Sequence, residues 1–179
     1  MRLLLIAPGY LPYTFSENLC NGKLAYAMYK KGWHVDVLSK VDEGPAYSTE
    51  WTEPWLPLKK NNITITYPVG GKLTRMWDVL RSSVKLGMYP EGGVRWACRA
   101  YELALKLCKE NHYDAVLTRS PSDIPHIIGL RLKEKLGIRW IANWNDPAAP
   151  IWPEPYTHHF SAKEQARRDQ FTRMCLKGA

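Results

Sequence analysis

Short apolar runs that alternate with helix-like segments constrain the fold of this chain more than any other feature. The first run, residues 3–7, stops at a Pro-Gly pair, and residues 18–31 then carry apolar side chains at helical spacing, with Gly32 just past their end. A continuous apolar run of this length is typical of a strand that is covered on both faces, as in a parallel sheet. Residues 35–39 follow as a second strand, so the chain is predicted to begin with a right-handed βαβ unit.

The same alternation continues along the chain. Strands are predicted at 63–67, 114–118 and 138–142, and helices at 72–85, 92–110, 124–136 and from near Ser161 onwards. Strands separated by helices favour an α/β fold, here a doubly wound, Rossmann-like parallel sheet with helices on both faces. A chain of 179 residues fits one such fold around a single core, and we expect one domain, residues 1–179.

Composition and spacing exclude several classes of protein. No stretch reaches the roughly 18 to 20 apolar residues that a membrane-spanning helix needs, and the first apolar run is too short for a signal peptide, so we expect a cytoplasmic protein. The cysteines lack C-x-x-C spacing and the histidines lack H-x-x-x-H spacing, so no metal is expected. The formal charge of +8 favours an anionic partner, but nucleic-acid-binding motifs are missing and we expect no nucleic acid.

The last predicted strand delivers polar side chains to one edge of the sheet. Residues 138–142 form an apolar run that we expect to be a buried strand, and it ends at residues 143–147 (NWNDP). Open α/β sheets bind ligands outside the carboxyl ends of their strands, so Asn145 and Asp146 are candidate functional residues. Asp146 could accept a hydrogen bond from a substrate hydroxyl, or it could form an Asx turn beside Pro147, and both interpretations stay open.

One predicted helix, residues 72–85, is basic and amphipathic. Its apolar side is formed by Leu73, Met76, Trp77, Leu80 and Val84, and its basic residues are Lys72, Arg75, Arg81 and Lys85. We expect the apolar side to pack on the core and the charged side to face solvent. The alternative is that the helix lies on an anionic membrane surface with its apolar side in the interface.

Four stretches of the chain carry recognisable motifs. They are residues 8–12 (PGYLP); 23–38, with KLAYAM followed by KGWHVDVL; 113–117 (YDAVL) with a Ser-Pro exit and residues 127–130 (IIGL); and 137–147 (GIRWIANWNDP). These stretches resemble the N-terminal domain of family 4 glycosyltransferases, which are retaining enzymes with the GT-B fold. The second is similar to the family pattern L-A-x-x-L-x-x-x-G-H-x-V with Trp33 inserted, and the last is similar to W-I-A-D-F-R-D-P-W. Together with the entry strand, they make the resemblance cover nearly the whole chain.

The resemblance implies the acceptor-binding half of an enzyme that moves a sugar from a nucleotide-sugar donor to a saccharide or lipid-linked acceptor, as in bacterial polysaccharide or glycolipid synthesis. It assigns catalytic roles to Asp146 and Asn145. The residues expected to bind acceptor or donor are Tyr10, Tyr13, Ser16, Glu17, Asn18, Arg119 and Ser120.

The resemblance also implies a second domain. The family's donor site lies in a C-terminal Rossmann domain that we expect to be absent from this chain, so this domain alone is expected to be inactive. The nucleotide sugar is a co-substrate held by that second domain, and neither a cofactor nor a metal is expected. The enzyme is expected in the cytoplasm or peripherally at the inner face of the membrane.

Two positions depart from the family pattern. Phe15-Ser16-Glu17 stands where the family commonly has a Gly-Gly near the donor phosphates, and Asn145 stands where many relatives have His or Arg. A glutamate beside a diphosphate is unfavourable, and an asparagine can hydrogen-bond a sugar without carrying a proton. The alternative to a transferase is a non-enzymatic Rossmann-like module that binds a nucleotide or a protein, although it would lack a G-x-G-x-x-G motif. A self-contained hydrolase would lack a G-x-S-x-G elbow.

Overall fold

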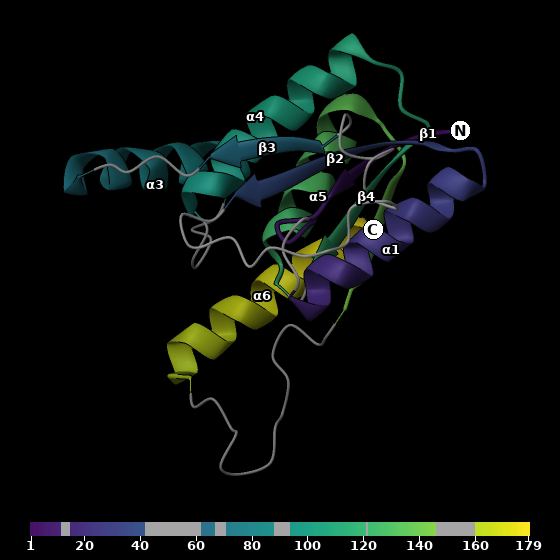
Figure 1. Cartoon of the computed structure of the whole chain (residues 1–179). Coiled ribbons are helices and arrows are strands. Elements are labelled where there is room, and N and C mark those ends of the chain that lie inside the picture. Colours follow the sequence, from purple (N-terminus) through teal and green to yellow (C-terminus); the bar gives the residue numbers. More distant parts are fainter. Residues whose placement is uncertain (12–14, 42–61, 67–70, 88–93, 121, 146–159) are drawn as a thin grey trace.

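The computed structural model describes residues 1–11, 15–41, 62–66, 71–87, 94–120, 122–145 and 160–179, and it confirms the α/β class (Figure 1). In chain order its elements are β1 (Arg2–Ile6), α1 (Ser16–Lys30), β2 (His34–Val41), β3 (Asn62–Thr66), α3 (Lys72–Leu86), α4 (Val94–Glu110), β4 (Ala115–Ser120), α5 (Ile124–Leu136), β5 (Trp140–Trp144) and α6 (Ala162–Gly178). The described strands form one sheet in the order β3-β2-β1-β4-β5, and every pair in it is parallel. β1 therefore lies at the centre, as in a doubly wound sheet.

Alternate residues of the central strand β1 enter two different cores. Leu3 and Leu5 pack with Ala25 of α1 on one face of the sheet, whereas Leu4 and Ile6 belong to the core with α4 and α5 on the other face. Figure 1 shows α1 on one side of the sheet and α4 on the other. A strand that is covered on both faces needs apolar residues at every position, which explains the continuous apolar run near the start of the sequence.

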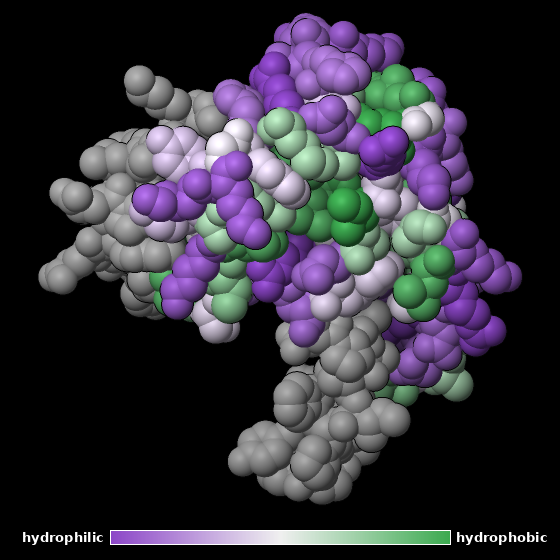
Figure 2. Space-filling model, turned by 90° about the vertical axis from the view of Figure 1, so that its right-hand side faces the viewer, coloured by the Kyte–Doolittle hydropathy of each residue, from purple (hydrophilic) through white to green (hydrophobic). Residues whose placement is uncertain are grey.

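The side of the molecule that is turned away from α3 has a mixed surface. Figure 2 shows small hydrophobic areas there, with hydrophilic residues bordering them. Scattered apolar residues of this kind are normal on a folded protein. Among the described helices, none is long and apolar enough to cross a membrane.

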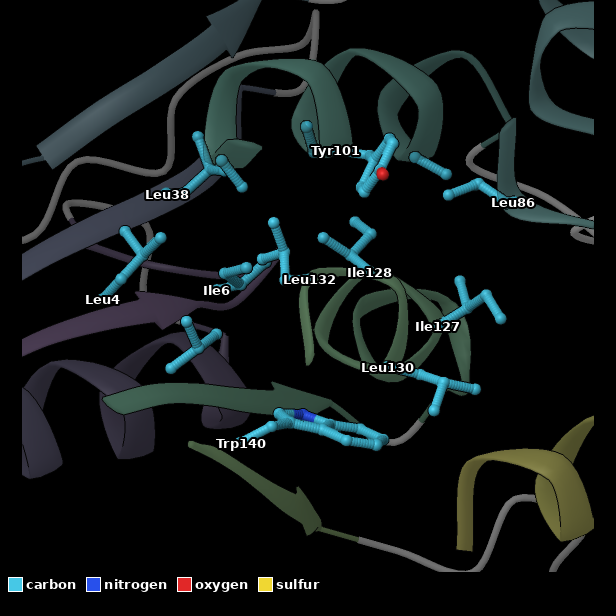
Figure 3. Close-up of a cluster of buried hydrophobic side chains, with 14 of the residues drawn as sticks. Leu4, Ile6, Leu38, Leu86, Tyr101, Ile127, Ile128, Leu130, Leu132 and Trp140 are labelled. Atoms are coloured by element: carbon cyan, nitrogen blue, oxygen red, sulfur yellow. The ribbon is translucent and has the colours of Figure 1, made fainter. Parts of the chain in front are cut away.

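The larger of the two cores lies between the sheet and helices α4 and α5. In Figure 3, Leu4 and Ile6 lie to the left of Ile128 of α5, Tyr101 of α4 lies above Ile128, and Trp140 of β5 borders the same cluster from below. Full burial of one large apolar side chain contributes roughly 2 kcal/mol. This cluster therefore fixes α5 against the strands whose carboxyl ends form the site described below.

Glycines and a capping box set three of the helix ends. Gly32 follows α1 with φ 79°, and Gly137 ends α5 with φ 67°. This left-handed backbone favours glycine, as expected for residues just past a helix. α6 begins with a capping box, in which the Ser161 hydroxyl accepts from the backbone N–H of Glu164 and the Glu164 carboxylate accepts from the backbone N–H of Ser161.

Two expectations from the sequence are wrong. The last strand spans Trp140–Trp144 rather than residues 138–142, and Ile141 on it is 52% exposed. Exposure alternates along β5, with Trp140 buried and Ile141 and Asn143 exposed, so this edge strand of the described sheet is covered on one face only. The second error concerns α3, because its apolar side faces outward and its buried residues are Asp78, Ser82 and Leu86.

Candidate functional site

The winding of the chain reverses between the neighbouring strands β1 and β4. After β1 the chain enters α1 on one face of the sheet, whereas after β4 it enters α5 on the other face. Open α/β sheets bind ligands at such a switch point, outside the carboxyl ends of the strands. The candidate site accordingly comprises the carboxyl ends of β1, β4 and β5 together with the first turn of α1.

Two asparagines of α1 hold the backbone that follows β1. The side-chain amide of Asn18 donates to the Tyr10 carbonyl (3.1 Å), and that of Asn21 donates to the Gly9 carbonyl (2.8 Å). Both asparagines are buried. A Cβ on Gly9 would lie 2.4 Å from Oδ1 of Asn18, so only glycine allows this close approach. The start of α1 is therefore fixed against the end of β1.

Arg119 connects both sides of the switch point. It lies at the carboxyl end of β4, where its Nε donates to Oδ1 of Asn145 (2.6 Å) and its Nη1 donates to the backbone carbonyl of Cys20 in α1 (3.2 Å). The backbone N–H of Asn145 in turn donates to the Ser120 carbonyl (3.4 Å). The two bonds from Arg119 use two of the five N–H donors of the guanidinium, which is half-buried. The arrangement presents a fixed cation beside a fixed amide at the edge of the sheet.

The turn between β4 and α5 is shaped by its own side chains. The hydroxyl of Ser120 accepts from the backbone N–H of Ser122 (3.0 Å) and lies 3.0 Å from the Ser122 hydroxyl. Asp123, just before α5, accepts from Nε1 of Trp144 (2.8 Å) and from the Thr172 hydroxyl of α6 (2.8 Å). The turn, the end of β5 and α6 are thus joined into one support for Arg119 and Asn145.

His126 lies beneath this support and was not singled out by the sequence. It is fully buried, its Nδ1 lies 2.8 Å from the Thr118 hydroxyl, and its ring centroid lies 3.9 Å from that of Trp144. The Thr118 oxygen also accepts from Nε1 of Trp140 (2.8 Å), so this hydroxyl joins the His126 ring to the Trp140 indole. Burial lowers the pKa of His126 to about 4, and the ring is therefore uncharged at neutral pH. A lone histidine in the apolar start of α5 was the signal that could have revealed it.

The predicted site residues divide into four groups. Arg119 and Asn145 are brought into direct contact, as described above. Ser16 is exposed and Glu17 is half-buried in the first turn of α1, whereas Tyr10, Asn18 and Ser120 are buried. Tyr13 and Asp146 lie outside the described residues.

Burial changes what three of these residues can do. Tyr10 is only 1% exposed and packs in the core beneath α1, so in this conformation its side chain is not accessible to a ligand. Asn18 uses its amide to hold the loop, and Ser120 uses its hydroxyl to shape the turn. All three therefore support the site rather than line it.

The electrostatics of the site combine a cation with an acidic helix start. α1 begins with Ser16 and carries Glu17 in its first turn, where a carboxylate is stabilised by the partial positive charge of the helix N-terminus. Glu17 would compete there with a ligand phosphate, which makes Arg119 the better placed group for an anion or for sugar oxygens. Among the described residues, no group of three or more His, Cys, Asp or Glu side chains could hold a metal ion.

Comparisons with known proteins inform the fold alone. Neither protein-family profiles nor curated proteins match this sequence. Among solved structures, the chain is similar to the C-terminal domain of a hydrogenase from Pyrococcus furiosus, with a TM-score of 0.51, 16% identity and coverage of 79% of this chain and 90% of that domain. It is also similar to MurG from Acinetobacter baumannii, with a TM-score of 0.47, 15% identity and coverage of 97% of this chain, which spans 39% of the MurG chain. The similarity to the hydrogenase domain, at 16% identity, supports the α/β fold. Neither similarity assigns a function.

Proposed function

We propose that this chain is the acceptor-binding domain of a retaining glycosyltransferase with two Rossmann-like domains. The contact of Arg119 with Asn145 and with α1 carries the proposal, because it lies at the carboxyl edge of the sheet. Two of the segments that resemble family 4 enzymes, residues 8–12 and 137–147, follow or contain the strands of that same edge. A fixed cation and amide at a switch point suit the hydroxyl groups and charges of a saccharide substrate.

The proposed reaction exchanges one bond at the anomeric carbon of the donor sugar. The bond from this carbon to the diphosphate oxygen breaks, and a bond to an acceptor hydroxyl oxygen forms with retention of configuration. The acceptor proton passes to the departing diphosphate, so the products are the glycosylated acceptor and a nucleoside diphosphate. Charge develops on the sugar ring and on the diphosphate in the transition state, and groups that stabilise this charge accelerate the step.

The roles follow from the chemistry of each side chain. Arg119 would donate to oxygens of the acceptor or of the departing phosphate, and Asn145 would hydrogen-bond an acceptor hydroxyl without exchanging a proton. Asp146 is proposed to accept a hydrogen bond from the reacting acceptor hydroxyl. Ser16 and Glu17, in the first turn of α1, are proposed to contact the acceptor from the opposite side. The second domain would hold the nucleotide sugar and supply most of the positive charge.

The proposal includes the location and the partners of the enzyme. It acts in the cytoplasm on a saccharide or lipid-linked acceptor, and it works peripherally at the inner face of the membrane where the acceptor is a lipid. Nucleic acid is not among its proposed partners. The donor domain would lie in the remainder of a longer gene product or in a separate subunit, and the intact mass of the native gene product distinguishes these two arrangements.

The test uses the native gene product together with the subunit that holds its donor domain, if the two are separate. Its activity is measured against a panel of nucleoside-diphosphate sugars by release of the nucleoside diphosphate and by mass spectrometry of the acceptor. Arg119→Gln and Asp146→Asn are each expected to lower kcat/KM about 10- to 100-fold, since a hydrogen bond to a charged group contributes about 1.5 to 3 kcal/mol.

Two variants of the same strand region serve as controls. Arg139→Gln removes an exposed arginine at the amino end of β5, and Lys135→Gln removes an exposed cation at the end of α5, just before that strand. Both should keep the activity of the unmodified enzyme. Full activity of Arg119→Gln would refute its role, and nucleotide binding without any sugar transfer would favour the non-enzymatic module instead.

A further inference from the structure

Helix α3 presents its apolar side to the outside of the molecule. Five large apolar residues are between 53% (Leu80) and 82% (Leu73) exposed: Leu73, Met76, Trp77, Leu80 and Val84. At 100° per residue all five fall within one side of the helix, opposite the buried residues Asp78, Ser82 and Leu86. An amphipathic helix on a soluble domain normally faces the other way, so this side of α3 requires a partner of its own.

Ion pairs with α4 hold α3 in this orientation. The Glu102 carboxylate of α4 accepts hydrogen bonds from Arg81 and Lys85, and Arg99 of α4 lies 3.9 Å from Asp78. Burial acts to raise the pKa of Glu102, but the hydrogen bonds from Lys85 and Arg81 outweigh it and lower this pKa; the same contact raises the pKa of Arg81. Turning the apolar side inward would separate these charges and bury them without partners, which is costly.

The C-terminal end of α3 is fixed as well. Leu86 is fully buried in the larger core, where Figure 3 shows it beside α4 and α5. The Nε of Arg131, on α5, donates to the Leu86 carbonyl (2.9 Å), and Gly87 then ends the helix with φ 74°. In Figure 1, α3 extends outward from this anchored end, past the sheet. The apolar side is thus displayed on a helix that is rigidly attached at its base.

The charges of α3 are sorted by side. Its one acidic residue, Asp78, is buried on the inner side, whereas Lys72 and Arg75 are exposed near its start. Helical spacing places Lys72 on one flank of the apolar side and Arg81 and Lys85 on the other flank. Apolar residues between basic flanks match a surface that is anionic outside and apolar beneath, which is the composition of an anionic lipid interface.

We propose that α3 is an interfacial helix that docks this domain on an anionic lipid surface. Leu73, Trp77 and Leu80 enter the boundary between headgroups and acyl chains, and Lys72, on the flank of the apolar side, contacts the lipid phosphates. A second copy of the chain fits this surface less well, because a symmetric contact through α3 would bring the basic flanks of both copies together. The inference does not depend on the proposed transferase activity.

Vesicle co-sedimentation of the 179-residue chain tests the proposal. Binding to vesicles of phosphatidylcholine with phosphatidylglycerol should exceed binding to phosphatidylcholine alone, and added salt should weaken it. Lys72→Gln, on the flank of the apolar side, should weaken binding about fivefold, whereas Arg75→Gln, which helical spacing places on the opposite side of α3, should weaken it less. The double variant Leu73→Ser/Trp77→Ser should weaken it about tenfold or more, because the inserted apolar area is lost. All four side chains are exposed, so circular dichroism should report an unchanged fold.

Matched controls come from α6. Leu176→Ser and Arg167→Gln each change an exposed residue of the same type on a different helix, and both should bind as the unmodified chain does. The proposal is overturned if the chain does not sediment with anionic vesicles, or if the α3 variants bind as tightly as the controls. A second outcome also overturns it: the chain does not bind vesicles, and ultracentrifugation without lipid detects a dimer that the α3 variants abolish.

Discussion

His126 gives the stability of the protein a specific pH dependence. Its pKa is about 4 in the folded protein because the ring is buried, whereas an unfolded histidine titrates near 6.5. Between these values the unfolded chain binds a proton that the folded chain does not. The free energy of unfolding should therefore fall as the pH drops from about 6.5 to about 4, by at most about 3 kcal/mol. Urea unfolding followed by circular dichroism across this range measures the effect.

Two histidine variants isolate this contribution. His126→Gln should flatten the slope of stability against pH between about 6.5 and about 4, whatever its effect on stability at neutral pH. His112→Gln changes an exposed histidine and should leave the slope as it is. If His126→Gln kept the full slope, the pH dependence would belong to other groups and the buried neutral ring would carry no linkage.

At the level of single residues, the sequence located part of the candidate site. Arg119 and Asn145 follow from two strands that end in polar residues, because the carboxyl ends of neighbouring parallel strands meet at one edge. The burial of Tyr10 and Asn18 did not follow, because it depends on the path of the loop between β1 and α1. Sequence spacing gives no information about which loop side chains turn inward.

Gly129 controls how closely helix α5 approaches strand β5. A Cβ at this position would lie 2.1 Å from Nε1 of Trp140, whose N–H donates to the Thr118 hydroxyl (2.8 Å). The indole cannot move away without breaking this buried bond. Gly129→Ala should therefore lower the free energy of unfolding by about 2 kcal/mol, although alanine is the better helix former. Urea unfolding measures the difference.

A second glycine provides the control for this packing effect. A Cβ on Gly71, just before α3, would meet no heavy atom within 4 Å, and the φ of this residue is −62°. Gly71→Ala should therefore change stability by less than about 1 kcal/mol. A Gly129→Ala protein as stable as the unmodified chain would mean that α5 and β5 separate easily.

Whole elements were predicted well, but the orientation of α3 was not. Continuous apolar runs and helical spacing located the elements to within a few residues, because both patterns are local. Helical spacing also identified the apolar side of α3 correctly. Which side faces the core depends on Glu102 and Arg99 of α4, far along the chain, and no periodicity within residues 72–85 contains that information. The sequence also placed β5 too early, because Ile138 packs against the core before the strand begins at Trp140.

At the scale of the whole molecule, the two edges of the sheet differ. The candidate site occupies the carboxyl edge, whereas a buried carboxylate joins three strands near the amino edge. Asp36 of β2 accepts hydrogen bonds from Tyr113, just before β4 (2.7 Å), and from Nη2 of Arg2 in β1 (2.9 Å), and it lies 3.1 Å from Nε2 of His34. Burial and the hydrogen bond to Asp36 both raise the pKa of Tyr113. This network holds the centre of the sheet together without contributing to the site.

Replacing this carboxylate should therefore reduce stability without changing function. Asp36→Asn removes the charge that Arg2 and Tyr113 share, and the free energy of unfolding should fall by about 2 kcal/mol, a moderate value because Arg2 is 36% exposed. Glu110→Gln, which breaks a surface pair with Lys106, should cost less than about 0.5 kcal/mol. Urea unfolding compares the two variants. Vesicle binding of folded Asp36→Asn protein should equal that of the unmodified chain, because α3 is held by α4 and α5; a parallel loss of both properties would mean that the amino edge and α3 are coupled.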